Sequence, residues 1–454
     1  MAILPIDSGR YGSKEIKKIF EEDERLGYIL TFEATVSKAQ AKLRIIPVEA
    51  ADEIYSLCKS NKIQLERVKE LESITDHDMG AIVEALGEQC SSKSKPWIHF
   101  GLTSNDLIDT TTSMQLRDSF GIIESKILNL ALMLSDTAIK YKLCPAVGRT
   151  HGQHASILPF GLKFAVWASE MTKHYERIIE ARKRFLVCKT LGVVGTGSLM
   201  GSNALKVQKI VSKSLNLFPV EAATQLVPRE RYAEVQFIIA LVGSTLDKIA
   251  VEIRNLQRTE LGELAEPFKE GQMGSSAVPV KRNPIKSERV SSLSKILKSL
   301  VNISMDNISL WHERDLSNSA NERFTIPMGI ILLDEMLNTM IKIIPKLNIF
   351  VDKIRSNIEV TKGQIYAEFV LESLISKGVP RMTAYRNIQR LAFSAFEKNQ
   401  QFIDAIKTDD LLGKYFTNKE LKDLFTPENH FASSLQIIEN VHRNILNINN
   451  SQKH

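Results

Sequence analysis

The sequence predicts an all-α protein with a central bundle of unusually long helices. The first observation is the spacing of the prolines, since a proline inside a helix removes a hydrogen bond and clashes with the preceding turn. Long proline-free gaps follow Pro96, Pro159, Pro228 and Pro284, and each could hold a helix of well above average length. The second observation is that β-strand signals are sparse and no regular series of hairpins is found.

The gap after Pro228 shows the helical pattern most clearly. Apolar residues recur at spacings of three and four from Val235 to Leu256, with charged residues between them. This pattern is typical of one apolar stripe along a helix. We therefore expect a helix over residues 232–266, about 50 Å long at ~1.5 Å per residue.

Similar patterns predict long helices over residues 110–143, 160–187 and 285–312. Helices of this length are marginal alone and need partners along their whole length, which favours an extended bundle and association between subunits. Shorter helical segments precede and follow them. We predict three domains: an N-terminal helical domain at 1–110, a central long-helix bundle at 111–361 and a C-terminal helical domain at 362–454.

The composition indicates a soluble globular protein. The 454 residues are 43% hydrophobic and 25% charged, with a net charge of +6. This mild basic excess suits anionic small molecules or a solvated surface, and the lack of a basic arm argues against nucleic acid. The four cysteines form no CxxC pair, which argues against a zinc ribbon or redox motif and favours reduced thiols. With neither a secretory signal nor an uncharged apolar stretch long enough to span a bilayer, we expect a cytoplasmic protein and no membrane partner.

A loop at residues 271–284 separates two of the expected long helices. It contains two glycines and two serines, and places Lys281, Arg282 and Asn283 between two prolines. Such a loop can close over a ligand and present donors to negative charge. From composition alone, a flexible linker is an equally good interpretation.

Three further segments carry polar residues in suggestive patterns. In residues 148–154, His151 and His154 could suggest a metal pair, but no further ligand lies at a supporting spacing, so we expect no metal. Residues 97–106 look like a turn into a helix N-terminus, which can bind anions or can simply be a well-capped helix end. His77 is flanked by Asp76 and Asp78, but this pattern alone is weak evidence for a functional site, because histidines near carboxylates are common on helix surfaces.

Read together, these segments resemble the fumarase/aspartase superfamily. The loop runs Gly274-Ser-Ser-Ala-Val-Pro-Val-Lys-Arg-Asn-Pro284 and matches the signature Gly-Ser-Ser-x-Met-Pro-x-Lys-x-Asn-Pro, with Val278 in place of methionine. Residues 148–154 and 97–106 resemble its Gly-Arg-Thr-His-Gly-x-His and His-x-Gly-x-Thr-Ser blocks.

Other matches are similar to the adenylosuccinate lyase branch. These are Arg10-Tyr11, the His-Asp pair at residues 77–78, Gln225 and the block from Glu313 to Arg323. Arginines and a serine in that last block suit a phosphate, which guanidinium groups bind bidentately. Asp76 departs from the branch, which usually has a basic residue or asparagine there, and Val280 stands where His or Tyr is frequent. The motifs cover residues ~9 to ~323.

The resemblance implies an enzyme without a cofactor that eliminates fumarate from adenylosuccinate, giving AMP, and from the succinylated aminoimidazole-carboxamide nucleotide SAICAR, giving AICAR, in purine biosynthesis. It implies that Ser275 is the base, His151 the general acid and Lys281 the cation that meets the developing carbanion. His77 would orient His151 or contact the substrate, and Glu288 would set the charge of a histidine. The implied substrate-binding residues are Arg10, Tyr11, Asp78, His99, Thr103, Ser104, Gln225, Ser276, Asn283, Arg289, Arg314, Ser319 and Arg323.

The resemblance also implies a homotetramer with active sites shared between subunits, and leaves three alternatives. Argininosuccinate lyase and aspartase- or fumarase-like enzymes share the signature loop, but Arg10-Tyr11, the Thr-Asp-His-Asp block at residues 75–78 and Gln225 argue against them. A catalytically retired scaffold would predict damage at Ser275, Lys281 or His151, and all three are intact. A serine hydrolase needs a GxSxG elbow and strands that the sequence lacks. The glycine-rich residues 191–201 fit neither GxGxxG nor a Walker A motif, and we interpret them as a loop near the site.

Overall fold

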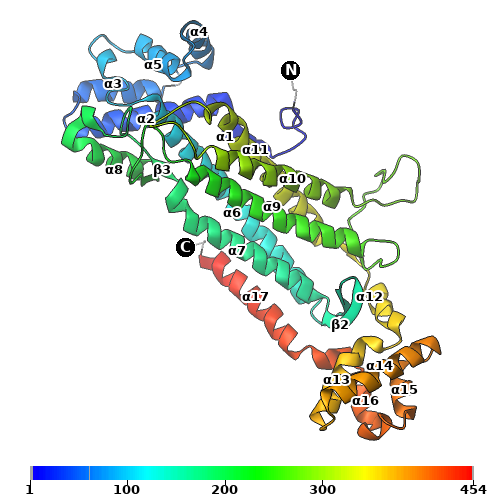
Figure 1. Cartoon of the computed structure of the whole chain (residues 1–454). Coiled ribbons are helices and arrows are strands. Elements are labelled where there is room, and N and C mark those ends of the chain that lie inside the picture. The colour runs from blue at the N-terminus through cyan, green and yellow to red at the C-terminus, as the bar shows by residue number, and fades with distance from the viewer. Residues whose placement is uncertain (1–3, 61, 452–454) are drawn as a thin grey trace. The chain divides into compact units, whose positions relative to one another are not determined.

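The computed structural model describes residues 4–60 and 62–451 and confirms the all-α class (Figure 1). The chain divides into two compact units that are not continuous in sequence. The first comprises residues up to 126 with 174–244 and 292–338, and the second comprises 127–173, 245–291 and 339–454. The predicted three-domain division is untested and stays a prediction.

The first unit is built from short N-terminal helices and parts of long ones. Its helices, some of which continue into the second unit, are α1 (Lys14–Ile19), α2 (Glu22–Lys42), α3 (Val48–Cys58), α4 (Leu65–Thr75), α5 (Asp78–Gln89), α6 (Ser104–Lys140), α8 (Ala204–Ser214), α9 (Glu230–Leu256) and α11 (Ser319–Ile343). The side chains of Phe32, Phe120 and Val235 are buried in its core.

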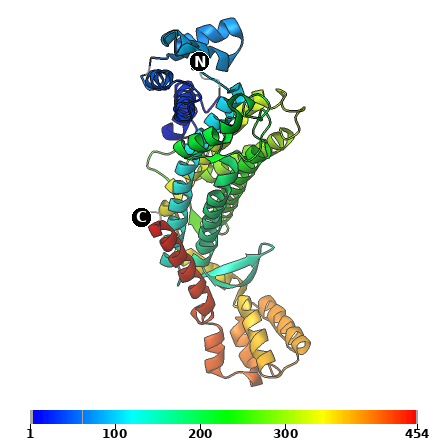
Figure 2. The same ribbon diagram turned by 90° about the vertical axis from the view of Figure 1, so that its left-hand side faces the viewer.

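The second unit holds a β-hairpin, helices and the C-terminal segment. Its own elements are β1 (Pro145–Thr150), β2 (Gln153–Pro159), α12 (Val351–Ile358), α13 (Ala367–Ser376), α14 (Arg381–Glu397), α15 (Phe402–Thr408), α16 (Asn418–Leu424) and α17 (Ala432–Ser451). The two units share the helices α6, α9, α11, α7 (Gly161–Phe185) and α10 (Ile285–Asp306). Helices α13 to α16 form a small group, orange in Figure 2, around the buried Val370, Leu374 and Phe402.

Three of the four predicted long helices, α6, α7 and α10, are found with ends shifted by a few residues. The prediction for α9 is wrong at its C-terminus, because the helix ends at Leu256 rather than continuing to residue 266. The apolar stripe also stops at Leu256, and Gly262 then adopts a left-handed φ of +56°. The chain continues as β5 (Leu264–Ala265), which pairs antiparallel with β6 (Asn348–Ile349).

Helix α11 was missed because Pro327 lies inside it. Proline costs one backbone hydrogen bond, and the helix is supported by contacts beside this point. Gln236 Nε2 donates a hydrogen bond to the Thr325 carbonyl (2.8 Å). Gly329 leaves room for this side chain, because a Cβ at Gly329 would lie 2.5 Å from Gln236 Oε1. Tertiary contact with α9 therefore overrides the local penalty.

One helix, although it contains charged residues, is long and apolar enough to pass a simple test for a membrane span. Residues Ser319–Lys346 are long and apolar enough by composition, but 67% of the most apolar window is buried inside the protein. Burial in the protein core accounts for the apolar composition of this helix.

Candidate active site

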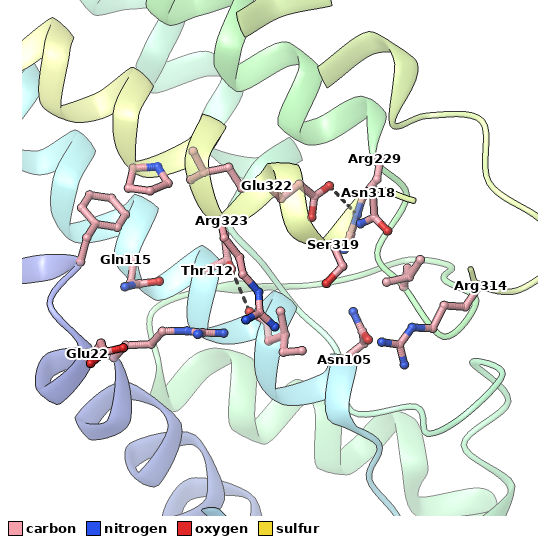
Figure 3. A pocket seen from close by; sticks show the side chains of 16 residues that line it. Glu22, Asn105, Thr112, Gln115, Arg229, Arg314, Asn318, Ser319, Glu322 and Arg323 are labelled. Carbon is pink, nitrogen blue, oxygen red and sulfur yellow. Dashed lines mark hydrogen bonds and ion pairs between the residues drawn. The ribbon is translucent and has the colours of Figure 1, made fainter. Parts of the chain in front are cut away.

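A cavity of about 270 Å³ lies in the first unit, where three helices and two loops meet (Figure 3). Its polar lining comes from α2, α6, the start of α11 and the segments that precede α9 and α11. The polar residues are Glu22, Arg25, Asn105, Thr112, Gln115, Arg229, Arg314, Asn318, Ser319, Glu322 and Arg323. The cavity thus brings together three predicted substrate-binding residues: Arg314, Ser319 and Arg323.

The N-terminal end of α6 forms one wall of this cavity. Asn105, Ile108, Thr112 and Gln115 line it at spacings of three and four, so one face of the helix is exposed to the cavity. Sequence reasoning missed this face, although the spacing was visible, because no known motif marked its later turns.

Thr103 and Ser104 stand where α6 begins, and both contact other predicted site residues. Gln225 Nε2 donates a hydrogen bond to Thr103 Oγ1 (3.0 Å), and Arg314 Nη1 donates one to Ser104 Oγ (3.4 Å). The structure therefore joins four predicted residues that are as much as 211 positions apart, from Thr103 to Arg314.

A buried ion pair fixes this end of α6. Asp106 Oδ1 lies 2.5 Å from Lys189 Nζ, and both side chains are fully buried. The Asp106 carboxylate also accepts hydrogen bonds from the backbone N–H groups of Thr103, Leu191 and Gly192. Burial raises the pKa of Asp106, an effect that the Lys189 ammonium opposes. The glycine-rich loop is thereby tied to the helix start.

His99 is held next to this turn in a left-handed conformation, with φ +59°. Its Nδ1 lies 2.7 Å from Oε1 of the buried Glu33. Burial on its own would lower the pKa of His99, but the Glu33 charge and hydrogen bond outweigh it, so the pKa is raised. His99, which we predict to contact the substrate, is therefore protonated more readily than a free histidine.

His77 and Asp78 lie at the start of α5. His77 Nδ1 accepts a hydrogen bond from the Gly80 N–H (2.9 Å) and caps the helix, while Asp78 Oδ2 lies 3.1 Å from Arg323 Nη2. Asp78 and Arg323 therefore meet as predicted members of one site. The capping bond leaves Nε2 of His77 as the ring nitrogen available for another partner.

Arg10 and Tyr11 precede a short segment that is anchored to α11. The Gly12 N–H donates to Glu335 Oε2 (3.2 Å) and the Ser13 N–H donates to Asp334 Oδ2 (2.8 Å). Gly12 has φ +80°, and a Cβ there would lie 2.4 Å from a side-chain carbon of Ile331, so the close approach requires glycine.

Arg229 was not predicted, and two carboxylates balance its charge. Its guanidinium lies 3.0 Å from Asp109 Oδ1 and 3.1 Å from Glu322 Oε1, and it donates a hydrogen bond to the Val227 carbonyl. Burial opposes its charge, but these carboxylates outweigh that effect, so the pKa of Arg229 is raised. No sequence motif marks this pairing, because its three members come from separate segments.

In the second unit, His151 stands at the tip of the β1–β2 hairpin, which sequence analysis missed. Thr150 pairs with Gln153, so His151 (φ +54°) and Gly152 (φ +76°) form a two-residue turn. Two positive φ values are typical of the type I′ turn, which favours glycine at its second position. The exposed His151 side chain is thus presented on a rigid two-residue turn.

The hairpin is fixed by a buried carboxylate. Arg149 donates hydrogen bonds to both carboxylate oxygens of Glu263 (2.5 and 3.2 Å), and Asn357 Nδ2 donates to Glu263 Oε1 (2.9 Å). Nearby, His154 Nδ1 is buried without a hydrogen-bond partner, and burial lowers the pKa of His154. Among residues 4–60 and 62–451, no cluster of three or more side chains is arranged to hold a metal ion.

The signature loop projects from the ends of α9 and α10 (Figure 1). Ser275 Oγ accepts hydrogen bonds from the N–H groups of Ala277 (3.3 Å) and Val278 (3.1 Å), and Asn283 Nδ2 donates to the Gly274 carbonyl (2.8 Å). The loop is therefore folded on itself, with its signature residues exposed or half-buried; these include Ser275, Ser276, Lys281, Asn283 and, at the start of α10, Glu288 and Arg289.

The loop residues and the hairpin histidine do not form a connected network within one chain. In the part of the chain that the structure describes, His151 makes no hydrogen bond to Ser275 or Lys281. The roles predicted for these residues therefore stay predictions.

Comparison with known proteins decides the family. Residues 10–297 match the family model described as lyase, and residues 363–441 match the one described as adenylosuccinate lyase C-terminus. The chain is 42% identical over 448 residues to the adenylosuccinate lyase of Methanocaldococcus jannaschii, covering 98% of this chain and 97% of that one. It is equally similar, 42% over 441 residues and 97% of each chain, to that of Pyrococcus abyssi.

The chain belongs to the adenylosuccinate lyase family. The C-terminal match extends the assignment to a region that no sequence motif had reached. A solved fumarate lyase from Mesorhizobium sp. BNC1 has a TM-score of 0.87 at 27% identity, over 95% of this chain and 98% of that chain. The predicted fumarase/aspartase-like fold and the C–N lyase class are therefore confirmed.

Proposed function

We propose that this lyase releases fumarate from adenylosuccinate, forming AMP, and from SAICAR, forming AICAR. The observation that carries the proposal is the cavity of the first unit. It is lined by Arg314, Ser319 and Arg323. Arg314 also donates a hydrogen bond to Ser104, next in sequence to Thr103, which accepts one from Gln225. Arginines and hydroxyls suit a nucleotide phosphate and the carboxylates of a succinyl group.

The chemistry follows from the loop and the hairpin. Ser275 removes the proton on the succinyl carbon next to a carboxylate, and the electron pair spreads onto that carboxylate. Hydrogen bonds from two backbone N–H groups favour the ionised serine oxygen that this step needs. Lys281, with Asn283, stabilises the dianionic intermediate. The C–N bond then breaks with release of fumarate, and His151 gives a proton to the leaving purine nitrogen.

We further propose that the enzyme is a cytoplasmic homotetramer whose sites combine residues from different subunits. Two features support shared sites: His151 and the signature loop are exposed, and within the described chain they are not hydrogen-bonded to each other. The long helices also carry exposed apolar side chains that a partner could cover, among them Phe237, Val251, Ile296 and Ile303.

The test is an ultraviolet assay with adenylosuccinate that follows AMP and fumarate, with wild type, Ser275→Ala and the control Ser299→Ala, an exposed serine on α10. We expect wild-type turnover and a loss of about 10²–10⁴-fold for Ser275→Ala, the range of general base catalysis. Ser299→Ala should match wild type. Failure of the wild-type protein to consume adenylosuccinate would overturn the substrate, and an active Ser275→Ala would overturn the base.

A further inference from the structure

Arg25 on α2 lines the same cavity and has no assigned role. Its side chain is half-buried, and in the described part of the chain it makes no hydrogen bond or ion pair within the distances usual for either. Arginine carries five N–H donors, so a half-buried guanidinium without partners is an unusual feature that calls for a ligand.

The charges around Arg25 leave it short of a counter-ion. Burial lowers the pKa of Arg25, the charge of Asp78 opposes this, and the charge of Arg323 adds to it. Asp78 is already paired with Arg323 at 3.1 Å. Two guanidinium groups therefore compete for one carboxylate.

The whole cavity has an excess of positive charge. Its lining contains four arginines and two glutamates. Asp109 and Glu322 neutralise Arg229. Glu22 forms an ion pair with Lys69, which does not line the cavity. Among the described residues, Arg25 and Arg314 have no ion-pair partner, whereas Arg323 is paired with Asp78. The cavity therefore favours a ligand with more than one negative charge.

Two helix N-termini add to this preference. Asn105 in the first turn of α6 and Ser319, the first residue of α11, both line the cavity (Figure 3). Helix N-termini carry free N–H groups and a partial positive charge, which favour phosphate. The buried Asn105 Oδ1 lacks a hydrogen-bond partner and can accept one from a ligand hydroxyl or from water.

We propose that Arg25 is a substrate-binding residue that holds the phosphate monoester of the nucleotide together with Arg314 and Arg323. The inference rests on the proposed function for the identity of the nucleotide, but not for the phosphate. Arg25 would satisfy its N–H donors on phosphate oxygens, and the phosphate would relieve the repulsion between Arg25 and Arg323.

Calorimetric titration of the full-length protein with AMP, adenosine and inorganic phosphate tests the proposal. The variants are Arg25→Gln and Arg25→Lys, and the matched control is Arg386→Gln, an exposed arginine on α14. A hydrogen bond to a charged group contributes about 1.5–3 kcal/mol, so we expect the Kd for AMP to rise roughly 10- to 100-fold in Arg25→Gln. Arg25→Lys should lie between this variant and wild type, because lysine keeps the charge but not the planar fork.

Adenosine distinguishes a phosphate ligand from a structural residue. Because it lacks the phosphate, its Kd should change by less than about twofold in Arg25→Gln. Equal weakening of AMP and adenosine, or unchanged AMP binding, would overturn the proposal. Failure of the wild-type protein to turn over adenylosuccinate would overturn the proposed function. Even then, weaker binding of inorganic phosphate by Arg25→Gln than by wild type would support the role of Arg25 in binding phosphate.

Discussion

Two histidines predicted to serve the active site share an uncommon backbone conformation. His99 has φ +59° and His151 has φ +54°, and a glycine with positive φ follows each within two residues. Left-handed conformations are costly for residues with a Cβ, and such strain is concentrated at functional sites. The motif identifies the histidines from sequence, but their presentation depends on the turn, which the surrounding hydrogen bonds impose.

A third histidine makes a pH prediction at the residue scale. His174 on α7 is buried, and burial with the neighbouring Arg177 lowers its pKa from 6.5 to about 4. Since the folded-state pKa lies below the unfolded one, the unfolded chain binds the proton first, and stability falls as the pH drops from about 6.5 towards 4. Between pH 7 and pH 5 this group should cost about 1–2 kcal/mol.

Calorimetry of wild type and His174→Gln at both pH values, at one protein concentration, measures this effect. The drop in Tm on acidification should be smaller in the variant, because glutamine has no proton to gain. Equal drops in the two proteins would show that another group accounts for the acid sensitivity of this region.

At the scale of elements, the sequence predicts what local periodicity encodes and misses what distant contacts decide. The stripe of α9 predicts its existence, but its end depends on Gly262 and on the β5–β6 pairing. Helix α11 continues through Pro327 because Gln236 on α9 donates a hydrogen bond to its Thr325 carbonyl. In the site, motifs predict residues such as Ser104 and Arg314. Arg229 was missed because its partners Asp109 and Glu322 lie far away in sequence, and Arg25 was missed because no motif includes it.

The base of the signature loop gives a second prediction. Glu266, which is buried, accepts hydrogen bonds from Ser287 N–H and Oγ (both 2.6 Å) and from the Lys286 N–H (3.3 Å). These bonds tie the chain before the loop to the first turn of α10. We infer that Glu266 is a positioning residue that keeps the two ends of the loop together.

Glu266→Ala should leave the Ser287 N–H unsatisfied and loosen the loop, with a loss of about 10- to 100-fold in kcat/KM for the removal of a charge-assisted contact of 1.5–3 kcal/mol. Trypsin should also cut faster after Lys281 or Arg282. Glu270→Ala, which changes an exposed glutamate directly before the loop, is the control and should change neither measurement. Faster cleavage without a change in kcat/KM would show that loop position is unimportant for turnover.

At the scale of the whole molecule, the long helices leave apolar side chains exposed. Exposed apolar side chains follow the long helices, including Val166 on α7, Phe237 on α9 and Ile303 on α10. Isolated exposed apolar residues are ordinary, but their recurrence on helices that need partners favours association. In the tetramer that we propose, a second copy would cover these faces, and the signature loop of one copy would meet the β1–β2 hairpin of another.

Mixing two inactive variants tests this arrangement. Ser275→Ala and His151→Asn should each be nearly inactive, and subunits exchanged between them at equal amounts should recover up to about a quarter of wild-type activity, because that fraction of shared sites would draw both intact residues from different chains. The recovered activity should fall when the protein is diluted below the dissociation constant of the subunits, which sedimentation would measure. If each site took both residues from one chain, every site in the mixture would carry a defect and no activity would return, whatever the extent of exchange.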